Sequence, residues 1–202
     1  MKLWYSNASP FARKVRAVIA HHQLQSQIEC LLTPNSHDPN SPHNKDNPLG
    51  RVPALQLANS QWLVNSSFIA EYLDALGKNE KLIAQTEDRW QVQQLHYFAD
   101  GILENEMSLV PEKLHRPSNE WWQERHQIIF ARTQKSLEKL SQMIAPFDYA
   151  LNLGTLNAVC TIDYLAFRDN LTHASQHPHF ANLQQWAAQM NEKYSCLAQT
   201  KP

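Results

Sequence analysis

A serine stands near the start of this chain, where a strand signal gives way to a helix signal. Lys2–Tyr5 is a short, largely apolar run, and Pro10 suits the first turn of a helix with Ser9 as its N-cap. The first turn of a helix has unpaired backbone N–H groups and a partial positive charge. A thiolate that accepts a hydrogen bond from the Ser9 hydroxyl there would have a lowered pKa. This corner could therefore activate a thiol that the protein does not itself own.

The size of that effect matters for chemistry at neutral pH. A free thiol has a pKa of about 8.5 and is only a few per cent ionised at neutral pH. Lowering that pKa by about two units corresponds to roughly 2.7 kcal/mol and makes the thiolate predominate. Taken alone, however, Ser9 is more often a simple N-cap, and Arg13, Lys14 and Arg16 predict only a solvated helix face.

A proline marks the second segment with chemical interest, residues 47–55. Pro53 opens an apolar strand, where a proline cannot donate a ladder hydrogen bond. One interpretation is a trans proline at the start of a strand. The other is a cis bond after Val52 that turns the Val52 backbone outward. Its N–H and C=O could then pair with an extended peptide ligand, as a neighbouring strand does.

The third segment precedes another predicted helix. Asn65 and Ser66 stand before apolar residues that recur at i, i+3, i+4 and i+7, namely Ile69, Tyr72, Leu73 and Leu76. Unpaired N–H groups and a hydroxyl at a helix N-terminus form a seat for a carboxylate. The plainer interpretation is again a helix cap.

The elements that must position these residues alternate between strand and helix. After the first helix, residues 27–32 predict a strand, 33–48 a polar loop with a short helical turn, and 54–57 with 61–64 an antiparallel hairpin. Beyond residue 86 the apolar residues recur at helical spacing only. We therefore predict an α/β domain over residues 1–76, a linker over 77–86 and an all-helical domain over 87–202.

Composition argues against several classes of partner. The formal net charge is −1, which favours neither nucleic acid nor an anionic membrane. No stretch approaches the roughly 18 apolar residues of a membrane span, and the start lacks the apolar core of a signal peptide. The three cysteines are an odd number without a close pair, so we expect no disulfide framework and a reducing cytoplasm.

The cysteines and histidines predict no metal site and no redox centre. Cys30 lies on a predicted strand and is expected to be buried, Cys160 lies near an apolar helical face, and Cys196 is expected to be exposed. With no cysteine near Ser9, dithiol–disulfide exchange is disfavoured. The closest histidines lack acidic or cysteine partners and predict a polar loop; they are His173, His177 and His179.

Together, the three segments resemble the active-site segments of cytosolic glutathione transferases in their order and spacing. That family has a thioredoxin-like N-terminal domain and an all-helical C-terminal domain. Three short runs in the helical part are similar to those of a bacterial group with a serine-type active site; they are residues 89–90, 99–103 and 116–117. The resemblance spans residues 1–76 in order and is weaker beyond them.

The resemblance implies a role for each matching residue. Ser9 matches the hydroxyl that stabilises the glutathione thiolate, and Val52 matches the residue whose backbone pairs with the ligand's cysteine. Pro53 matches the cis proline, and Ser66 matches the hydroxyl that binds the γ-glutamyl carboxylate. The implied glutathione site is completed by Phe11, by Arg51 near the glycine end, and by Asn65.

Two positions depart from the family's pattern. Asn65 stands where the family usually has Gln or an acidic residue, and its shorter side chain predicts weaker γ-glutamyl binding. In the helical part, Asn152 can cap a helix, but Thr155 stands where the family's capping box has a carboxylate. We therefore expect that helix to begin less firmly, by about 1 kcal/mol.

The function implied is conjugation of the glutathione thiolate to a small apolar electrophile, as in detoxification. A peroxidase or isomerase that uses the same site, and a non-catalytic module that binds another protein, are the alternatives. The resemblance also implies a homodimer, with glutathione as co-substrate and no metal. Candidates for the electrophile pocket are Trp90, His96, Asp100 and Met107.

Overall fold

The computed structural model describes residues 1–33, 35 and 38–201. Its N-terminal domain contains a four-stranded mixed sheet in the order β2-β1-β3-β4, in which β1 is parallel to β2, and β3 is antiparallel to both β1 and β4. The elements are β1 (Lys2–Tyr5), α1 (Pro10–His21), β2 (Glu29–Leu32), α2 (His43–Asp46), β3 (Ala54–Gln56), β4 (Trp62–Val64) and α3 (Ser66–Leu76). The predicted order of strands and helices, the hairpin and the short helical turn are confirmed. The predicted loop over residues 33–48 includes three positions, 34, 36 and 37, outside the described residues.

The two faces of the sheet are covered by different helices. Leu3 is fully buried in the core that α1 and α3 share with the sheet. Trp4 points to the opposite face because side chains alternate along a strand. Its indole Nε1 donates a 2.7 Å hydrogen bond to Asp46 in α2, so α2 covers that opposite face.

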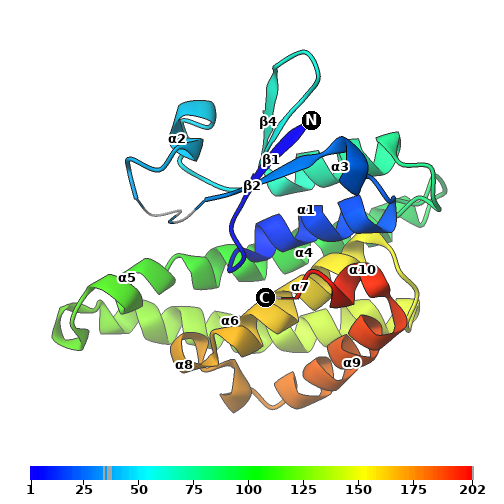
Figure 1. Ribbon diagram of the computed structural model, residues 1–202. Coiled ribbons are helices and arrows are strands. Elements are labelled where there is room, and N and C mark those ends of the chain that lie inside the picture. The colour runs from blue at the N-terminus through cyan, green and yellow to red at the C-terminus, as the bar shows by residue number, and fades with distance from the viewer. Residues whose placement is uncertain (34, 36–37, 202) are drawn as a thin grey trace.

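The C-terminal part is mostly helical, and it lies below the sheet and α1 in Figure 1. Its helices are α4 (Arg89–Met107), α5 (Val110–His115), α6 (Gln123–Ile144), α7 (Leu153–Phe167), α8 (Asp169–Thr172), α9 (Phe180–Lys193) and α10 (Ser195–Ala198). Every residue of α7 from Leu153 to Leu165 is buried. A Cβ at Gly154 would lie 2.7 Å from the carbonyl oxygen of Val92 in α4, so only glycine permits this close approach of α7 to α4. Among the described residues, none of the helices is long and apolar enough to span a bilayer.

The start of α7 corrects the expectation of a weak helix N-terminus. The Asn152 side chain accepts the Thr155 N–H at 2.9 Å, and the Thr155 hydroxyl accepts the Asn152 N–H at 3.0 Å. The capping box is therefore complete with a hydroxyl in place of a carboxylate.

Two cysteine predictions are also wrong, while Cys160 is buried as predicted. Cys30 is exposed because β2 is an edge strand with only one neighbouring strand. Cys196 is buried because α10 folds back against α1 and α9. The chain's last turns therefore belong to the core beside α1.

Candidate functional site

The Ser9 hydroxyl lies at the N-terminus of α1 and still has a free donor. Ser9 is the N-cap, as predicted, and its Oγ accepts a hydrogen bond of 3.2 Å from the Ala12 N–H. That bond uses a lone pair and leaves the hydroxyl hydrogen. Among the described residues, nothing accepts that hydrogen. Helix capping and donation to a ligand anion are thus compatible at this residue.

The peptide bond between Val52 and Pro53 is cis, which is the geometry that the resemblance implies. The described part of the chain offers no hydrogen-bond partner to the N–H or C=O of Val52. The turn before it is held by Asn47, whose buried side chain donates to the Arg51 carbonyl at 2.7 Å. The Val52 backbone therefore keeps its donor and its acceptor for another chain.

Asn65 caps α3 and occupies two of the N–H groups that could have bound a carboxylate at this helix N-terminus. It has a φ of 74°, and its Oδ1 accepts the N–H groups of Ser67 at 2.9 Å and Phe68 at 3.3 Å. These two donors are therefore already used. The N–H and hydroxyl of Ser66 have no partner among the described residues, so the seat for an anion at this helix end is centred on Ser66.

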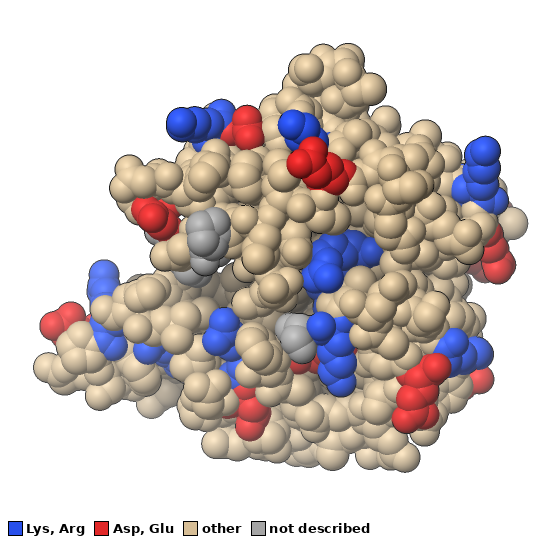
Figure 2. Space-filling model, in the orientation of Figure 1, with Lys and Arg blue, Asp and Glu red and all other residues tan. Residues whose placement is uncertain are grey.

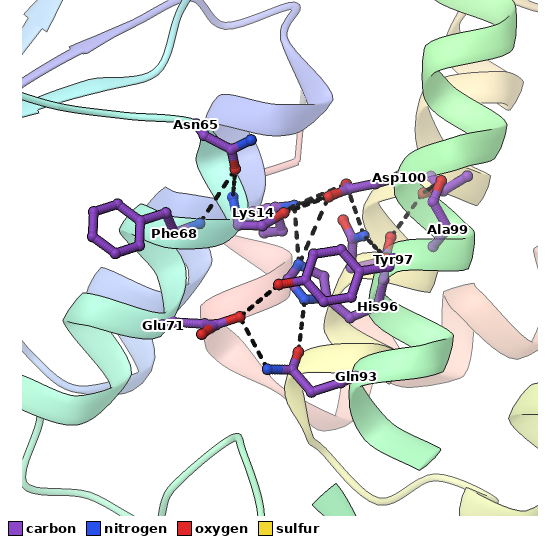
Figure 3. Close-up of polar contacts among 12 residues, drawn as sticks. Lys14, Asn65, Phe68, Glu71, Gln93, His96, Tyr97, Ala99 and Asp100 are labelled. Carbon is purple, nitrogen blue, oxygen red and sulfur yellow. Dashed lines mark hydrogen bonds and ion pairs between the residues drawn. The ribbon is translucent and has the colours of Figure 1, made fainter. Parts of the chain in front are cut away.

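A buried ion pair between Lys14 and Asp100 lies near Asn65, the N-cap of α3 (Figure 3). The Lys14 ammonium lies 2.8 Å and 2.7 Å from the two carboxylate oxygens of Asp100 in α4. It also donates to the Ser67 hydroxyl and to His96 Nε2, both at 3.1 Å. The Ser67 hydroxyl in turn donates to Asp100 Oδ2 at 2.5 Å. Lys14 has no exposed surface, so the predicted solvated helix face is wrong at this position.

The direction of each hydrogen bond in this cluster follows from the Lys14 charge. An ammonium only donates, so His96 must accept at Nε2 and carry its proton on Nδ1, which donates to Gln93 at 3.3 Å. Burial, together with the Lys14 charge, lowers the pKa of His96 to about 3. His96 is therefore neutral.

The carboxylate and the ammonium remain charged. Burial lowers the pKa of Lys14 against the attraction of Asp100. For Asp100, burial acts to raise the pKa, but the Lys14 charge and hydrogen bonds outweigh it and the pKa lies below its ordinary value. Both carboxylate oxygens lie within hydrogen-bond distance of Nζ, which is the geometry of an ionised pair.

The residues predicted for an electrophile pocket do not form one group. His96 is fully buried and cannot contact a ligand, and Asp100 is occupied by Lys14. Trp90 is 74% exposed at the start of α4, and Met107 is half-buried at the end of that helix. The buried polar cluster therefore includes two of the four residues, and the electrophile pocket stays a prediction.

The remaining predicted ligand contacts are accessible. Arg51 is exposed and Phe11 is half-buried, with its ring centroid 5.9 Å from the Lys14 ammonium. Figure 2 shows a hollow between the N-terminal domain and the helical part, on the side where α1 begins in Figure 1. Two cavities within the described residues, of about 200 and 330 Å³, are lined instead by residues of the helical part.

Surface charge and metal-ligating side chains mark no second candidate site within the described part of the chain. Basic and acidic side chains are interspersed on the face shown in Figure 2. Over the described residues, no three His, Cys, Asp or Glu side chains are grouped so that they could hold a metal ion.

A thioredoxin-like domain followed by a helical part, with a hydroxyl at the start of α1 and a cis proline before β3, defines the glutathione transferase architecture. Residues 8–76 match the family model described as "Glutathione S-transferase, N-terminal domain". The N-terminal domain of the chain is therefore similar to that of glutathione S-transferases.

Individual relatives agree with this assignment. An uncharacterised GST-like protein, YibF, from Escherichia coli (strain K12) is 26% identical over an alignment of 180 positions that covers 83% of this chain and 83% of its own. A glutathione transferase family member from Pseudomonas fluorescens Pf-5, solved with bound glutathione, is 26% identical with a TM-score of 0.87 and covers 100% of this chain and 98% of its own. A glutathione S-transferase from Methylobacillus flagellatus KT, also solved with glutathione, is 27% identical with a TM-score of 0.83 and the same coverage.

Proposed function

We propose that this protein is a glutathione transferase that uses Ser9 to stabilise the glutathione thiolate and conjugates it to a small apolar electrophile. The observation that carries the proposal is the uncommitted hydroxyl hydrogen of Ser9 at the N-terminus of α1. The glutathione bound in the two bacterial relatives supports the choice of thiol.

In the proposed complex, glutathione lies extended across the N-terminal domain. The Val52 N–H and C=O pair with the ligand's cysteine, the γ-glutamyl carboxylate binds Ser66, and Arg51 lies near the glycine end. The Ser9 O–H and the α1 dipole favour the thiolate over the thiol. That thiolate forms the C–S bond at the electrophilic carbon, and the leaving group departs with the electron pair of the broken bond. Holding both reactants close supplies the rest of the rate.

The alternatives share this site and differ in the step after glutathione has bound. A peroxidase or isomerase would use the same thiolate on another substrate, and a non-catalytic module would bind glutathione without turnover. Initial rates with a panel of electrophiles and with cumene hydroperoxide separate the two enzymatic functions. Glutathione binding without the ultraviolet absorbance of a thiolate, and without turnover on the panel, would favour the module.

We further propose a homodimer in the reducing cytoplasm. Three aromatic side chains on α3 and α4 are largely exposed: Phe68, Trp90 and Tyr97. The Tyr97 hydroxyl donates to Glu71 at 2.9 Å, which joins the two helices into one face (Figure 3). A second copy packed on this face would cover these rings. Sedimentation of the wild type and of Phe68→Ser tests this: the variant should shift toward monomer.

A further inference from the structure

We propose that Lys14 is a positioning residue for glutathione: its ammonium cancels the Asp100 charge behind the N-terminus of α3 and so keeps the Ser66 seat favourable for the γ-glutamyl carboxylate. This inference rests on the proposed function. Lys14 does not touch glutathione in this proposal. Its charge nevertheless raises the affinity for glutathione.

Asp100 lies close to the Ser66 seat. Ser67 follows Ser66 in the chain, and its hydroxyl donates to Asp100 Oδ2 at 2.5 Å. The negative charge of Asp100 is therefore hydrogen-bonded to Ser67, the residue that follows Ser66. Without compensation, that carboxylate would repel a second carboxylate arriving at Ser66, and the repulsion is large where water is excluded.

The net charge of the buried cluster depends on Lys14. Lys14 contributes one positive charge and Asp100 one negative charge, while His96 is neutral. The remaining contacts of Asp100 are Ser67 and the Asn157 amide, at 3.0 Å, and both are uncharged. The cluster is therefore neutral only while Lys14 is present and protonated.

The neighbouring buried cation, Arg13, cannot replace Lys14. Arg13 is 2% exposed, but its guanidinium lies 2.8 Å from Asp163 in α7. It also donates to Asn191 and to the Leu197 carbonyl in the C-terminal segment. Arg13 thus holds α1 to the helical part, and its polar partners all lie outside α3, which makes it a matched control.

The experiment is calorimetric titration of glutathione into the intact protein and four variants, at a temperature where each is folded. Lys14→Met removes the positive charge and should raise the Kd at least about tenfold, as expected for an uncompensated buried charge. Lys14→Met/Asp100→Asn removes both charges and should bind within about threefold of the wild type. Asp100→Asn alone should bind at least as tightly as the wild type.

Arg13→Met is the control: it should lower the thermal midpoint as Lys14→Met does and leave the glutathione Kd within about threefold of the wild type. An equal loss of glutathione affinity in Lys14→Met and Arg13→Met would overturn the inference, because lost packing alone would then explain both results. Failure of the double variant to recover affinity, or weaker binding by Asp100→Asn, would overturn it even if Lys14→Met does not fold. A wild type that binds no glutathione would instead contradict the proposed function.

Discussion

Arg13 in α1 forms a buried ion pair with Asp163 in α7, with Nη1 2.8 Å from Oδ2. The two groups are close but not aligned as a hydrogen bond. The Asn191 amide completes the contact by donating to Asp163 at 2.9 Å while its oxygen accepts from Arg13 at 3.1 Å. This pair and the Lys14–Asp100 pair join adjacent residues of α1 to two different helices of the C-terminal part.

Breaking the first of these pairs should destabilise the fold strongly. Arg13→Met leaves the Asp163 carboxylate without its main partner, so the free energy of unfolding should fall by about 3 kcal/mol. Urea denaturation followed by circular dichroism measures the change. Arg132→Met, at an exposed position of α6, is the control and should change stability by no more than about 0.5 kcal/mol. A loss below about 1 kcal/mol for Arg13→Met would contradict this account of the pair.

Asp74 should be equally important at the junction between α3 and the segment after it. Its buried carboxylate accepts the N–H of Leu82 at 2.7 Å, the N–H of Ile83 at 3.1 Å and the His22 ring at 2.8 Å. Asp74→Ala should lower the free energy of unfolding by about 3 kcal/mol because three donors lose their acceptor. Hydrogen exchange should show faster exchange at residues 82 and 83. Unchanged exchange there would contradict the prediction.

His96 should make the protein sensitive to acid. The unfolded chain takes up a proton near pH 6.5, whereas folded His96 does so only near pH 3. The contribution of His96 to the free energy of unfolding is therefore constant above pH 6.5 and falls as the pH drops between these values, by about 1.4 kcal/mol per pH unit. Burial lowers the pKa of His22 and His177 as well, so they add to the loss.

The matched comparison is His96→Gln, which keeps an acceptor for Lys14 but does not titrate. Urea denaturation of both proteins in a pH series from about 7.5 to about 5 should give a shallower fall for the variant, by up to about 1.4 kcal/mol per unit. Parallel curves would show that His96 does not carry the effect.

The three thiols should differ sharply in reactivity. Cys30 is exposed, although partial burial of its sulfur raises its pKa, so its alkylation should be slow at neutral pH and accelerate as the pH rises. Cys160 is fully buried with a pKa of about 11, and burial also raises the pKa of Cys196. Mass spectrometry of the native protein should find a single alkylated residue, and Cys30→Ser should remove it. Early labelling of Cys160 would contradict the burial of α7.

The helices and strands around the site could be predicted, because helix caps and apolar spacing are visible in a few neighbouring residues. Ser9 before Pro10 and Asn65 before a regular apolar spacing define the starts of α1 and α3 from a few neighbouring residues. The cis bond before Pro53 came from the resemblance, because local sequence leaves cis and trans prolines open.

The buried polar cluster could not be predicted because its partners are distant in sequence. Lys14 and Asp100 are separated by 86 positions, and only the packing of the helical part on α1 brings them together. One signal was available: Lys14 falls between Phe11 and Val18 at helical spacing, within the apolar stripe of α1. A lysine in such a stripe requires a buried partner. Ser67 and Asn47 carried no comparable signal.

The most direct test of the account is the thiol pKa of bound glutathione in the wild type and in Ser9→Ala. Ultraviolet difference spectra over a pH series, at saturating glutathione, report the thiolate in each protein. Ser9→Ala should still bind glutathione, but the pKa of the bound thiol should rise by about one to two units, because the O–H donor is lost while the helix N-terminus remains. An identical titration in both proteins would contradict this prediction and assign the thiolate to another group.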